Sequence, residues 1–491
     1  MKIGFSGNRS DLDPSKIKYL TLSEIAEAVD GRIVGGADAE DIRVYGMCTD
    51  SREAETGVMF AAIKGERTDG HNYISTARQK GCDCFLCERV PTEEDSVSVN
   101  SKIGFVVVKD TVKALADLAK YYFQRLSVKT VGITGSVGKT TTKEFIDCVL
   151  SQRFVTHKTE GNYNSAIGLP LVVLETPSDT EIQILEMGMG NKGDIAYLSD
   201  IAVPDIGIIT NIGHAHIEAL GSRENICKAK LEITESMKKG SVLLLNGDEP
   251  LLDGYSDPDL TVCRVSLKND RADIFAQNIK LGFGYCSFDI VDKISHKVCS
   301  DVIINTSGEH NIYAALFAYA VGCTVLEMDE SEIRSGLGKY QSVGLRQKIT
   351  QIKGNTLIED CYNAGPESMA ASLANLRNMG KVSGRGTLAV LGDMLELGDE
   401  TARLHRYVGR VAAEIEPRYL ILFGEQAQYI KEGALEGGYP CDRIFLFGAD
   451  ERSEAAKKIV SLMSGEDIVL FKASRGMRAE LISDAVKDIL S

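Results

Sequence analysis

A glycine-rich stretch with one lysine and several hydroxyl side chains carries the strongest chemical signal in the sequence, Val131 to Thr142 (VGITGSVGKTTT). An apolar run at residues 130–133 precedes the glycines, and a helical pattern follows from Thr141 through Leu150. Backbone N–H groups at a helix start attract anions, and glycines let the backbone curl around a phosphate. This order of strand, loop and helix predicts a binding site for a nucleoside triphosphate.

The residues of this loop would share the task of holding the triphosphate. We expect Lys139 to reach the outer phosphates as a point charge and the Thr140 hydroxyl to bind Mg²⁺. The usual spacing, G-x-x-x-x-G-K-[ST], needs glycine where this chain has Ile133, so the loop is the tighter G-x-x-G-K-T. Because a strand and a helix flank it, we favour nucleotide binding over a turn without a ligand. The nucleotide-binding residues predicted here are Gly135, Ser136, Val137, Gly138, Lys139, Thr140 and Thr141.

Polar side chains follow two further strand-like runs. Glu186 ends the apolar run 182–185, and the run 206–210 is followed by an asparagine and then by His214 and His216. In an open α/β sheet, ligands collect at the carboxyl ends of the strands, and a carboxylate there suits Mg²⁺. Histidines spaced two apart face opposite ways in an extended chain, so we expect one of them to point into the site.

Residues 188–194 (GMGNKGD) match two other nucleotide motifs, G-x-G-x-x-G and N-K-x-D. The first would place a dinucleotide site in the same domain as a phosphate loop. The second follows the phosphate loop too closely, and no D-x-x-G lies between them. We therefore interpret this run as a turn that opens a helix.

Size and charge limit the class of protein. A chain of 491 residues is too long for one hydrophobic core, and its 44% hydrophobic and 25% charged content is that of a globular protein. The formal net charge of −15 argues against a general role on nucleic acids or membrane surfaces. There is no run of 18 apolar residues, and the first residues lack the apolar core of a secretory signal.

The twelve cysteines are scattered and form no disulfide framework. The cluster Cys82-x-Cys84-x-x-Cys87 could hold a metal, but no second ligand pair follows at zinc spacing. We interpret it as a strand with small residues alternating across it. The expected compartment is therefore reducing, that is, the cytoplasm.

The alternation of strand-like and helical runs predicts an α/β protein of three domains. A small N-terminal α/β domain is placed at residues 1–109, with 1–20 as an appended segment. A central parallel-sheet domain with the phosphate loop is placed at 110–343, and a C-terminal Rossmann-like domain at 344–491. Six strand-like runs mark the last domain: KITQI, TLIED, TLAVLGD, YLILFG, RIFLFG and DIVLFK.

Several shorter elements are also expected. Thr21 and Glu24 predict a capping box at a helix start, and residues 113–126 predict an amphipathic linking helix. Residues 310–321 and 331–338 predict two more helices. Further strand-like runs are VMFAAI, CDCFLC and IGFVVV before the phosphate loop, and QILEMG, DIGIITNI and SVLLLN after it.

Taken together, several motifs resemble the Mur ligases, the ATP-dependent amide-forming enzymes of peptidoglycan synthesis. In the central part these are TGSVGKTTTKE, GNYN, IGLP, EMG and TNIGHAH. In the C-terminal part they are DCYNA, LGDMLELG with a following LH, and KASRGMR. The C-terminal runs are most similar to the family members that add D-alanyl-D-alanine to UDP-N-acetylmuramoyl-tripeptide. The resemblance covers roughly residues 21 to 491.

The resemblance implies ATP and Mg²⁺ as cofactors and assigns roles near the phosphates. Lys139, His216 and Lys230 would be catalytic, and Thr140, Glu186, His216 and Lys230 would hold the metal ions. Lys230 falls where the family often carries a carbamylated lysine, whereas without the resemblance the default interpretation is an ordinary surface lysine on a helix. The residues that would hold the adenosine or reach the γ-phosphate are Asn311, Arg346, Asp360 and Tyr362.

The resemblance also assigns the other substrates. Residues 50–52 and 70–71 look like a uridine-diphosphate cradle, although Arg52 could equally be a solvated surface charge. The expected partners are the two small-molecule substrates, with no nucleic acid, no membrane insertion and a monomeric chain. The implied substrate-binding residues are Asp50, Ser51, Arg52, Gly70, His71, Asn164, Asn363, Lys472, Ser474 and Arg475.

Three positions depart from the family pattern. Ala314 and Gly365 stand where the family usually has asparagine, and Ala473 stands where it usually has glycine. These changes admit a family member that joins a different amine. Two other classes stay open: a nucleotide-driven switch that makes no covalent product, and a dehydrogenase that uses residues 188–193.

Overall fold

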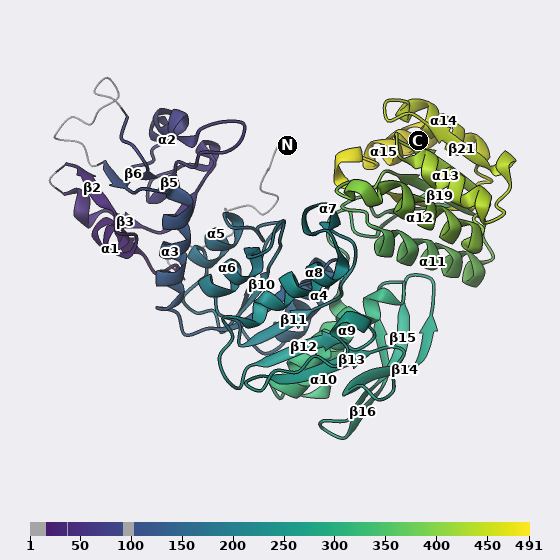
Figure 1. The fold of residues 1–491 in the computed structure, drawn as a ribbon, viewed down its shortest axis with the longest axis horizontal. Coiled ribbons are helices and arrows are strands. Elements are labelled where there is room, and N and C mark those ends of the chain that lie inside the picture. The colour runs from purple at the N-terminus through teal and green to yellow at the C-terminus, as the bar shows by residue number, and fades with distance from the viewer. Residues whose placement is uncertain (1–15, 37, 92–102) are drawn as a thin grey trace.

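Residues 16–36, 38–91 and 103–491 are described by the computed structural model, and they form three lobes (Figure 1). Each lobe is built on one main β-sheet, and the first and third lobes flank the central one. The predicted α/β class with three domains is confirmed. The boundaries predicted after residues 109 and 343 stay predictions; helix α3 begins at Thr111 and strand β17 begins at Lys348.

The first lobe holds a five-stranded sheet in the order β2-β7-β6-β5-β4, parallel except for β2. The cysteine cluster forms a strand as predicted: Cys84 and Leu86 enter one core, while Phe85 and Cys87 enter the other. Its elements are β1 (Leu20–Thr21), α1 (Leu22–Ala28), β2 (Arg32–Gly35), β3 (Arg43–Val44), β4 (Gly46–Cys48), β5 (Val58–Ala61), α2 (Ile74–Gln79), β6 (Cys84–Cys87) and β7 (Gly104–Val107).

The first described residues pack into the hydrophobic core instead of forming a separate segment. The predicted capping box is present, because Glu24 N–H donates to Thr21 Oγ at 3.2 Å and Thr21 N–H donates to a Glu24 carboxylate oxygen at 2.8 Å. Ile17 and Leu20 are buried, so the end of the predicted appended segment belongs to the core. Residues 1–15 of that segment lie outside the described residues.

The central sheet has nine strands in the order β16-β15-β14-β13-β12-β11-β8-β10-β9. It is parallel from β9 to β14, and β14, β15 and β16 continue it as antiparallel strands. Its strands are β8 (Lys129–Thr134), β9 (Thr156–Lys158), β10 (Ile182–Glu186), β11 (Ile206–Ile209), β12 (Val242–Asn246), β13 (Thr261–Ser266), β14 (Ile274–Leu281), β15 (Cys286–Asp292) and β16 (Lys297–Ile304).

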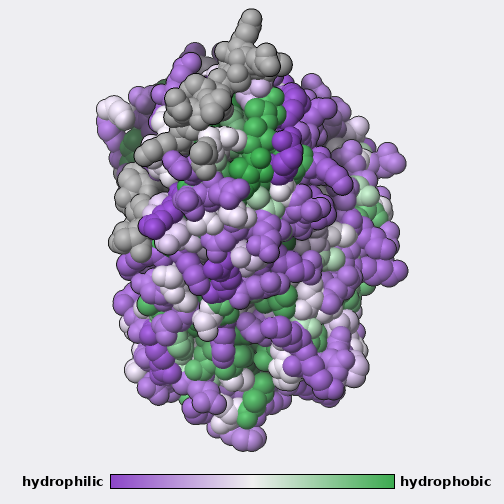
Figure 2. Space-filling model, turned by 90° about the vertical axis from the view of Figure 1, so that its left-hand side faces the viewer, coloured by the Kyte–Doolittle hydropathy of each residue, from purple (hydrophilic) through white to green (hydrophobic). Residues whose placement is uncertain are grey.

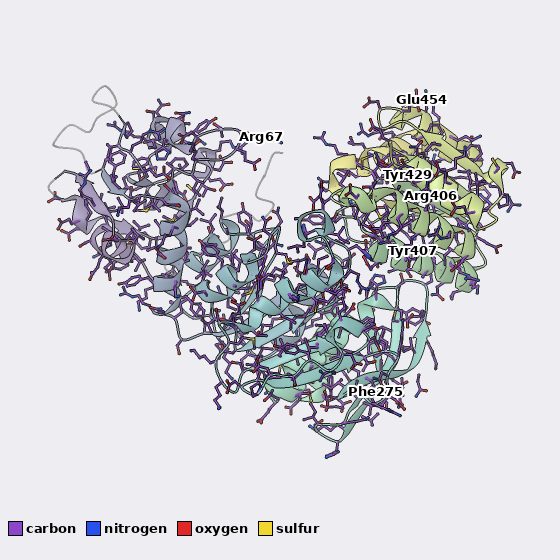
Figure 3. All side chains as sticks on the ribbon, viewed as in Figure 1. Arg67, Phe275, Arg406, Tyr407, Tyr429 and Glu454 are labelled. Atoms are coloured by element: carbon purple, nitrogen blue, oxygen red, sulfur yellow. The ribbon has the colours of Figure 1, made fainter. Side chains whose placement is uncertain are left out.

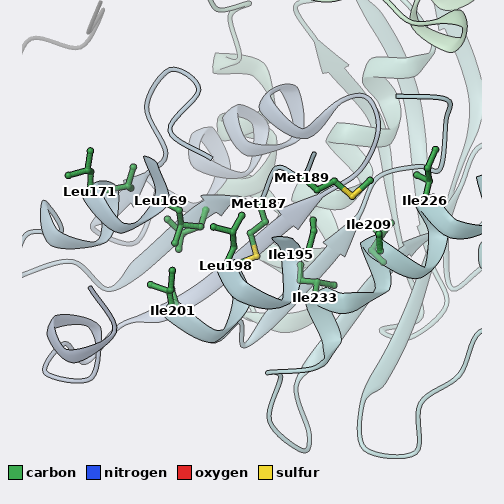
Figure 4. Packing of buried hydrophobic residues seen from close by; sticks show 14 of the residues in the cluster. Leu169, Leu171, Met187, Met189, Ile195, Leu198, Ile201, Ile209, Ile226 and Ile233 are labelled. Atoms are coloured by element: carbon green, nitrogen blue, oxygen red, sulfur yellow. The ribbon is translucent and has the colours of Figure 1, made fainter. Parts of the chain in front are cut away.

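Helices cover both faces of this sheet. Apolar side chains of the helices pack against the strands and hold the strand ends in position. On one face, apolar side chains such as Leu169, Leu198 and Ile226 pack with Met187 and Ile209 at the ends of β10 and β11 (Figure 4). The helices are α3 (Thr111–Phe123), α4 (Lys139–Leu150), α5 (Gly168–Leu174), α6 (Asp194–Ile201), α7 (Ile217–Leu220), α8 (Arg223–Leu231), α9 (His310–Tyr319) with a π-helical continuation (Ala320–Val325), and α10 (Glu330–Lys339).

The third lobe holds a six-stranded sheet in the order β17-β18-β22-β19-β20-β21, parallel except for β17. All six predicted strands are confirmed. The elements are β17 (Lys348–Ile352), β18 (Asn355–Glu359), α11 (Pro366–Ser383), β19 (Thr387–Gly392), α12 (Thr401–Ile415), β20 (Tyr419–Phe423), α13 (Ala427–Glu436), β21 (Ile444–Phe447), α14 (Arg452–Leu462), β22 (Ile468–Lys472) and α15 (Glu480–Leu490).

Hydrophilic residues cover most of the face that the first lobe presents in Figure 2. None of the described helices combines the length with the apolar composition that a membrane-spanning helix requires.

Candidate active site

A deep cavity of about 950 Å³ lies where the central and third lobes meet. The phosphate loop between β8 and α4 forms part of its wall. Gly135 and Gly138 have φ values of 147° and 88°, which side-chain-bearing residues rarely adopt. A Cβ on Gly135 would lie 1.8 Å from Thr210 Oγ, so the close approach of these two segments requires glycine.

The neighbouring strand end holds the loop in place. Thr210 Oγ donates to the carbonyl of Val137 at 2.6 Å, and the Asn211 side-chain oxygen accepts from the N–H of Val137 at 2.9 Å. α4 starts at Lys139, two residues earlier than predicted, and no side chain caps its first turn. Its free N–H groups therefore face the cavity and can bind an anion.

Lys139 is the cation of this loop. Its Nζ donates to the carbonyl of Gly135 at 2.7 Å. Burial and the nearby Arg346 lower the pKa of Lys139, while Glu186 opposes the shift. Burial deprives the Lys139 ammonium of hydration. A phosphate entering the cavity would compensate for this loss and favour the charged form of Lys139.

Glu186 ends β10, next to β8, and only 1% of its surface is exposed. Asn164 Nδ2 donates to one of its carboxylate oxygens at 3.4 Å. The other oxygen accepts no hydrogen bond in the described part of the chain and lies 3.7 Å from Lys143 Nζ. A buried carboxylate oxygen left open beside a phosphate loop is a suitable ligand for a hard cation.

The two predicted histidines face different ways, as expected. His216 lines the cavity and has a left-handed φ of 65°, with Nδ1 3.3 Å from a carboxylate oxygen of Glu396. His214 does not line it and instead pairs with Glu367. Within residues 16–36, 38–91 and 103–491, no group of three or more His, Cys, Asp or Glu side chains could hold a metal by itself. A metal here would need oxygens from a phosphate and water as well.

Lys230 is not the surface lysine that its local sequence allows. It lies on α8 with 1% of its surface exposed, and its Nζ is 4.0 Å from the sulfur of Met189, which lines the cavity. Burial and the positive charge of Lys139 lower the pKa of Lys230 well below its usual value. No Asp or Glu among the described side chains offsets this shift, so its amine is predisposed to be neutral.

The third lobe contributes a second set of charges to the same cavity. The guanidinium of Arg346 lies 4.1 Å from the centre of the Tyr362 ring. Lys472 Nζ donates to Asp360 at 2.6 Å, and this pairing together with the Ser372 hydroxyl holds the pKa of Asp360 below its usual value despite burial. Cationic groups from a separate lobe therefore face the phosphate loop across the cavity.

The predicted uridine-diphosphate residues lie in the first lobe, away from this cavity. Arg52 pairs with Asp50, its Nε lying 2.8 Å from a carboxylate oxygen, so Arg52 is not simply a free surface charge. His71 is buried and both ring nitrogens are engaged, Nδ1 with Asp69 at 2.6 Å and Nε2 with the N–H of Glu88 at 2.9 Å. Arg67, on the loop before His71, points toward the third lobe in Figure 3.

Most predicted site residues line this same cavity, and a smaller group lies outside it. Those that line it are Ser136, Val137, Gly138, Lys139, Thr140, Thr141, Asn164, Glu186, His216, Asn311, Arg346, Asp360, Tyr362, Asn363, Lys472, Ser474 and Arg475. Those that do not are Asp50, Ser51, Arg52, Gly70, His71, Gly135 and Lys230.

Several residues that line the cavity were not among the predicted site residues. Gln347, Glu367 and Glu396 come from the third lobe or its connection to the central lobe, so no local motif marks them. His310 directly precedes Asn311 and could have been included with it. Tyr340, which stacks on Phe145 with ring centres 3.8 Å apart, also lines the cavity.

The run 188–194 opens a helix, as predicted. Gly193 has a φ of 92° at the start of α6, and the Asp194 carboxylate accepts from the N–H groups of Gly190 and Asn191 at 2.7 and 2.8 Å. Because these N–H groups are already occupied, the turn is not the open glycine cradle of a dinucleotide site.

Three family models match the chain in consecutive segments. They are the Mur ligase family catalytic domain over residues 43–123, the Mur ligase middle domain over residues 133–322, and the Mur ligase glutamate ligase domain over residues 346–475.

Individual proteins match along almost the whole length. The UDP-N-acetylmuramoyl-tripeptide--D-alanyl-D-alanine ligase of Bacillus subtilis is 36% identical over 477 residues, which cover 96% of this chain and 99% of that protein. A crystal structure of MurF from Acinetobacter baumannii matches with a TM-score of 0.85 and 28% identity, over 96% of this chain and 100% of that one. MurF from Thermotoga maritima in complex with ADP matches with a TM-score of 0.78 and 28% identity, over 91% and 97% of the two chains.

Proposed function

Because this chain belongs to the Mur ligase family, we propose that it joins UDP-N-acetylmuramoyl-tripeptide to D-alanyl-D-alanine at the expense of ATP. The product is an amide in the synthesis of peptidoglycan precursors. One observation carries this function: the phosphate loop and the charged residues of the third lobe line a single cavity. A ligase needs this arrangement because the activated acid and the incoming amine must meet beside the triphosphate.

The reaction that fits the cavity has two steps. A terminal carboxylate oxygen of the tripeptide attacks the γ-phosphorus, and the bond from that phosphorus to the ADP oxygen breaks. The amine of the dipeptide then attacks the acyl carbon, loses a proton, and phosphate leaves with the carbon–oxygen electron pair. Lys139 and Arg346, which both line the cavity, would neutralise the charge on the transferring phosphoryl group.

Mg²⁺ belongs to this proposal. Glu186, with its open carboxylate oxygen, Thr140 and His216 all line the cavity, and their oxygen and nitrogen atoms would suit a cation that also takes phosphate oxygens and water. Bound there, Mg²⁺ would neutralise charge on the phosphates. A carbamate on Lys230 would turn this buried amine into a further oxygen ligand behind Met189.

The other substrates are assigned to the two outer lobes. Asn363, Lys472, Ser474 and Arg475 line the third-lobe wall and would hold the dipeptide. The uridine diphosphate would lie in the first lobe along residues 50–52 and 70–71. Both nitrogens of the His71 ring and the N–H groups of Gly70 and His71 are engaged within the lobe, so this turn would shape the pocket rather than donate to the ligand. We further propose that the chain acts as a monomer in the cytoplasm.

The function is tested with purified protein, ATP, Mg²⁺ and UDP-N-acetylmuramoyl-tripeptide. Phosphate release and amide product are measured with D-alanyl-D-alanine and, in parallel, with single amino acids. We expect both signals only with the dipeptide, and neither from a Lys139→Ala chain. Product with a single amino acid instead would indicate a family member with a different amine, and phosphate release without any acceptor would indicate a nucleotide-driven switch.

A further inference from the structure

Gln347 lies where the chain passes from the central lobe to the third lobe, one residue before β17. Its side chain lines the cavity, and its backbone has a φ of 53°, a left-handed conformation that is uncommon for glutamine. Residues held in this region are maintained by their surroundings, and such positions concentrate at ligand sites.

Two neighbours on α9 fix the carboxamide of Gln347. Its Nε2 lies 2.8 Å from Nε2 of His310, and its Oε1 accepts from Nδ2 of Asn311 at 3.3 Å. Burial lowers the pKa of His310 to about 4, so the ring is neutral at neutral pH and its Nε2 can accept. Asn311 Nδ2 is fixed as a donor by the Ser307 carbonyl at 2.8 Å, so the oxygen of Gln347 faces Asn311 and its NH₂ faces Nε2 of His310.

These contacts leave polar atoms available at the cavity wall. The NH₂ of Asn311 is committed to Ser307, Thr306 and Gln347, and its side-chain oxygen accepts no hydrogen bond from the described residues. Gln347 keeps a second N–H and a second lone pair. The wall therefore offers donors and acceptors side by side, next to the apolar and aromatic surfaces of Ala314 and Phe317.

A carboxamide of this kind matches one edge of adenine. Its oxygen accepts from the 6-amino group while its N–H donates to a neighbouring ring nitrogen. Hypoxanthine and guanine carry an oxygen at position 6, which would face the same carboxamide oxygen without a proton between them. A carboxamide held in this orientation would therefore distinguish a 6-amino purine from a 6-oxo purine.

We propose that Gln347, braced by His310 and Asn311, reads the purine and gives the site its preference for adenine. This inference rests on the nucleotide binding proposed above. It adds to that proposal a specificity-determining residue in the connection between two lobes. Nucleotide choice would then depend on the position of the third lobe, because Gln347 moves with β17.

The test measures equilibrium binding of ADP and of IDP, its 6-oxo counterpart, to the full-length protein. The variant is Gln347→Gly, because glycine adopts a φ of 53° without strain and folding is not put at risk. Gln277→Ala, at an exposed site on β14, is the matched control. Melting temperatures of the three proteins without nucleotide report any structural change.

We expect the wild type and the control to prefer ADP by at least about tenfold, the value of one good carboxamide–base pair. In Gln347→Gly, ADP should bind more weakly while IDP is nearly unchanged, so that the preference disappears. An equal loss for both nucleotides, or an unchanged preference, would overturn the role of Gln347. A wild type that binds neither nucleotide would instead overturn the proposed function.

Discussion

Nδ1 of His214 lies 2.5 Å from a carboxylate oxygen of Glu367, and this contact joins the central lobe to the first turn of α11 in the third lobe. Gly213, the residue before His214, donates its N–H to the hydroxyl of Ser136 in the phosphate loop at 2.9 Å. A Cβ on Gly213 would lie 2.8 Å from the Glu367 carboxylate, so the two lobes meet closely here. One peptide segment thus connects the phosphate loop to the third lobe.

Breaking this contact should affect turnover more than nucleotide binding. We expect Glu367→Gln to lower kcat by about 3- to 30-fold, the effect of one strong hydrogen bond that positions the third lobe, with ADP affinity little changed. Steady-state kinetics and ADP titration measure the two effects. Glu425→Gln, at an exposed position of the same lobe, should behave as wild type. A variant with unchanged kcat would show that the pair does not position the lobes for catalysis.

Glu186 should control the requirement for Mg²⁺. Replacing it by glutamine keeps the shape but removes the open anionic oxygen, so the Mg²⁺ concentration that half-saturates ADP binding should rise by at least about tenfold. Titration of Mg²⁺ at fixed ADP measures this shift. Glu181→Gln, at the exposed start of the same run, is the control. An unchanged Mg²⁺ dependence would remove Glu186 from the metal site.

Lys230 should carry a carbamate when CO₂ is available. Its lowered pKa leaves a neutral amine that can attack CO₂ and lose a proton, and burial protects the product from water. Native mass spectrometry of the protein in bicarbonate should show the added mass of one CO₂. The addition should vanish in Lys230→Met but persist in Lys228→Met, an exposed lysine on the same helix. Equal modification of both variants would refute the assignment.

His310 should make the protein sensitive to acid. Its pKa is lowered from 6.5 to about 4 by burial, so below pH 6.5 the unfolded chain binds a proton that the folded chain does not. This stability is present above pH 6.5 and is lost as the pH falls toward 4, by up to roughly 3 kcal/mol in total. Denaturant unfolding from pH 7 to 4 should show a shallower loss for His310→Gln than for the wild type or for His296→Asn in an exposed turn. Parallel curves for all three would contradict this account of His310.

Helices and strands that are marked by a short sequence motif or by a compact apolar run were predictable. The strand, glycines and helix around Lys139 follow from short-range chemistry, and the six strands of the third lobe are compact apolar runs between turns. Strands β13 to β16 were not predicted. In β15, buried Phe288 and Ile290 alternate with partly exposed residues. In β14 and β16, several polar side chains interrupt the alternation of apolar and polar residues that would have predicted a strand.

Site residues were predictable where they belong to a short motif that is continuous in the sequence. Glu367 and Gln347 enter the cavity because the lobes dock as they do, and sequence periodicity does not encode docking. The same reason explains why residues 50–52 and 70–71 carry a motif yet lie outside the cavity. Burial of Lys230 was also hidden, since it depends on Met189 and Lys139 from distant segments.

The transfer of phosphate to a substrate carboxylate is the central claim, and an isotope experiment tests it directly. The terminal carboxylate of UDP-N-acetylmuramoyl-tripeptide is labelled with a heavy oxygen isotope, and the protein is supplied with ATP, Mg²⁺ and D-alanyl-D-alanine. If the carboxylate oxygen attacks the γ-phosphorus, one labelled oxygen per amide formed must appear in the released phosphate, as mass spectrometry can measure. Amide product with unlabelled phosphate would contradict the account.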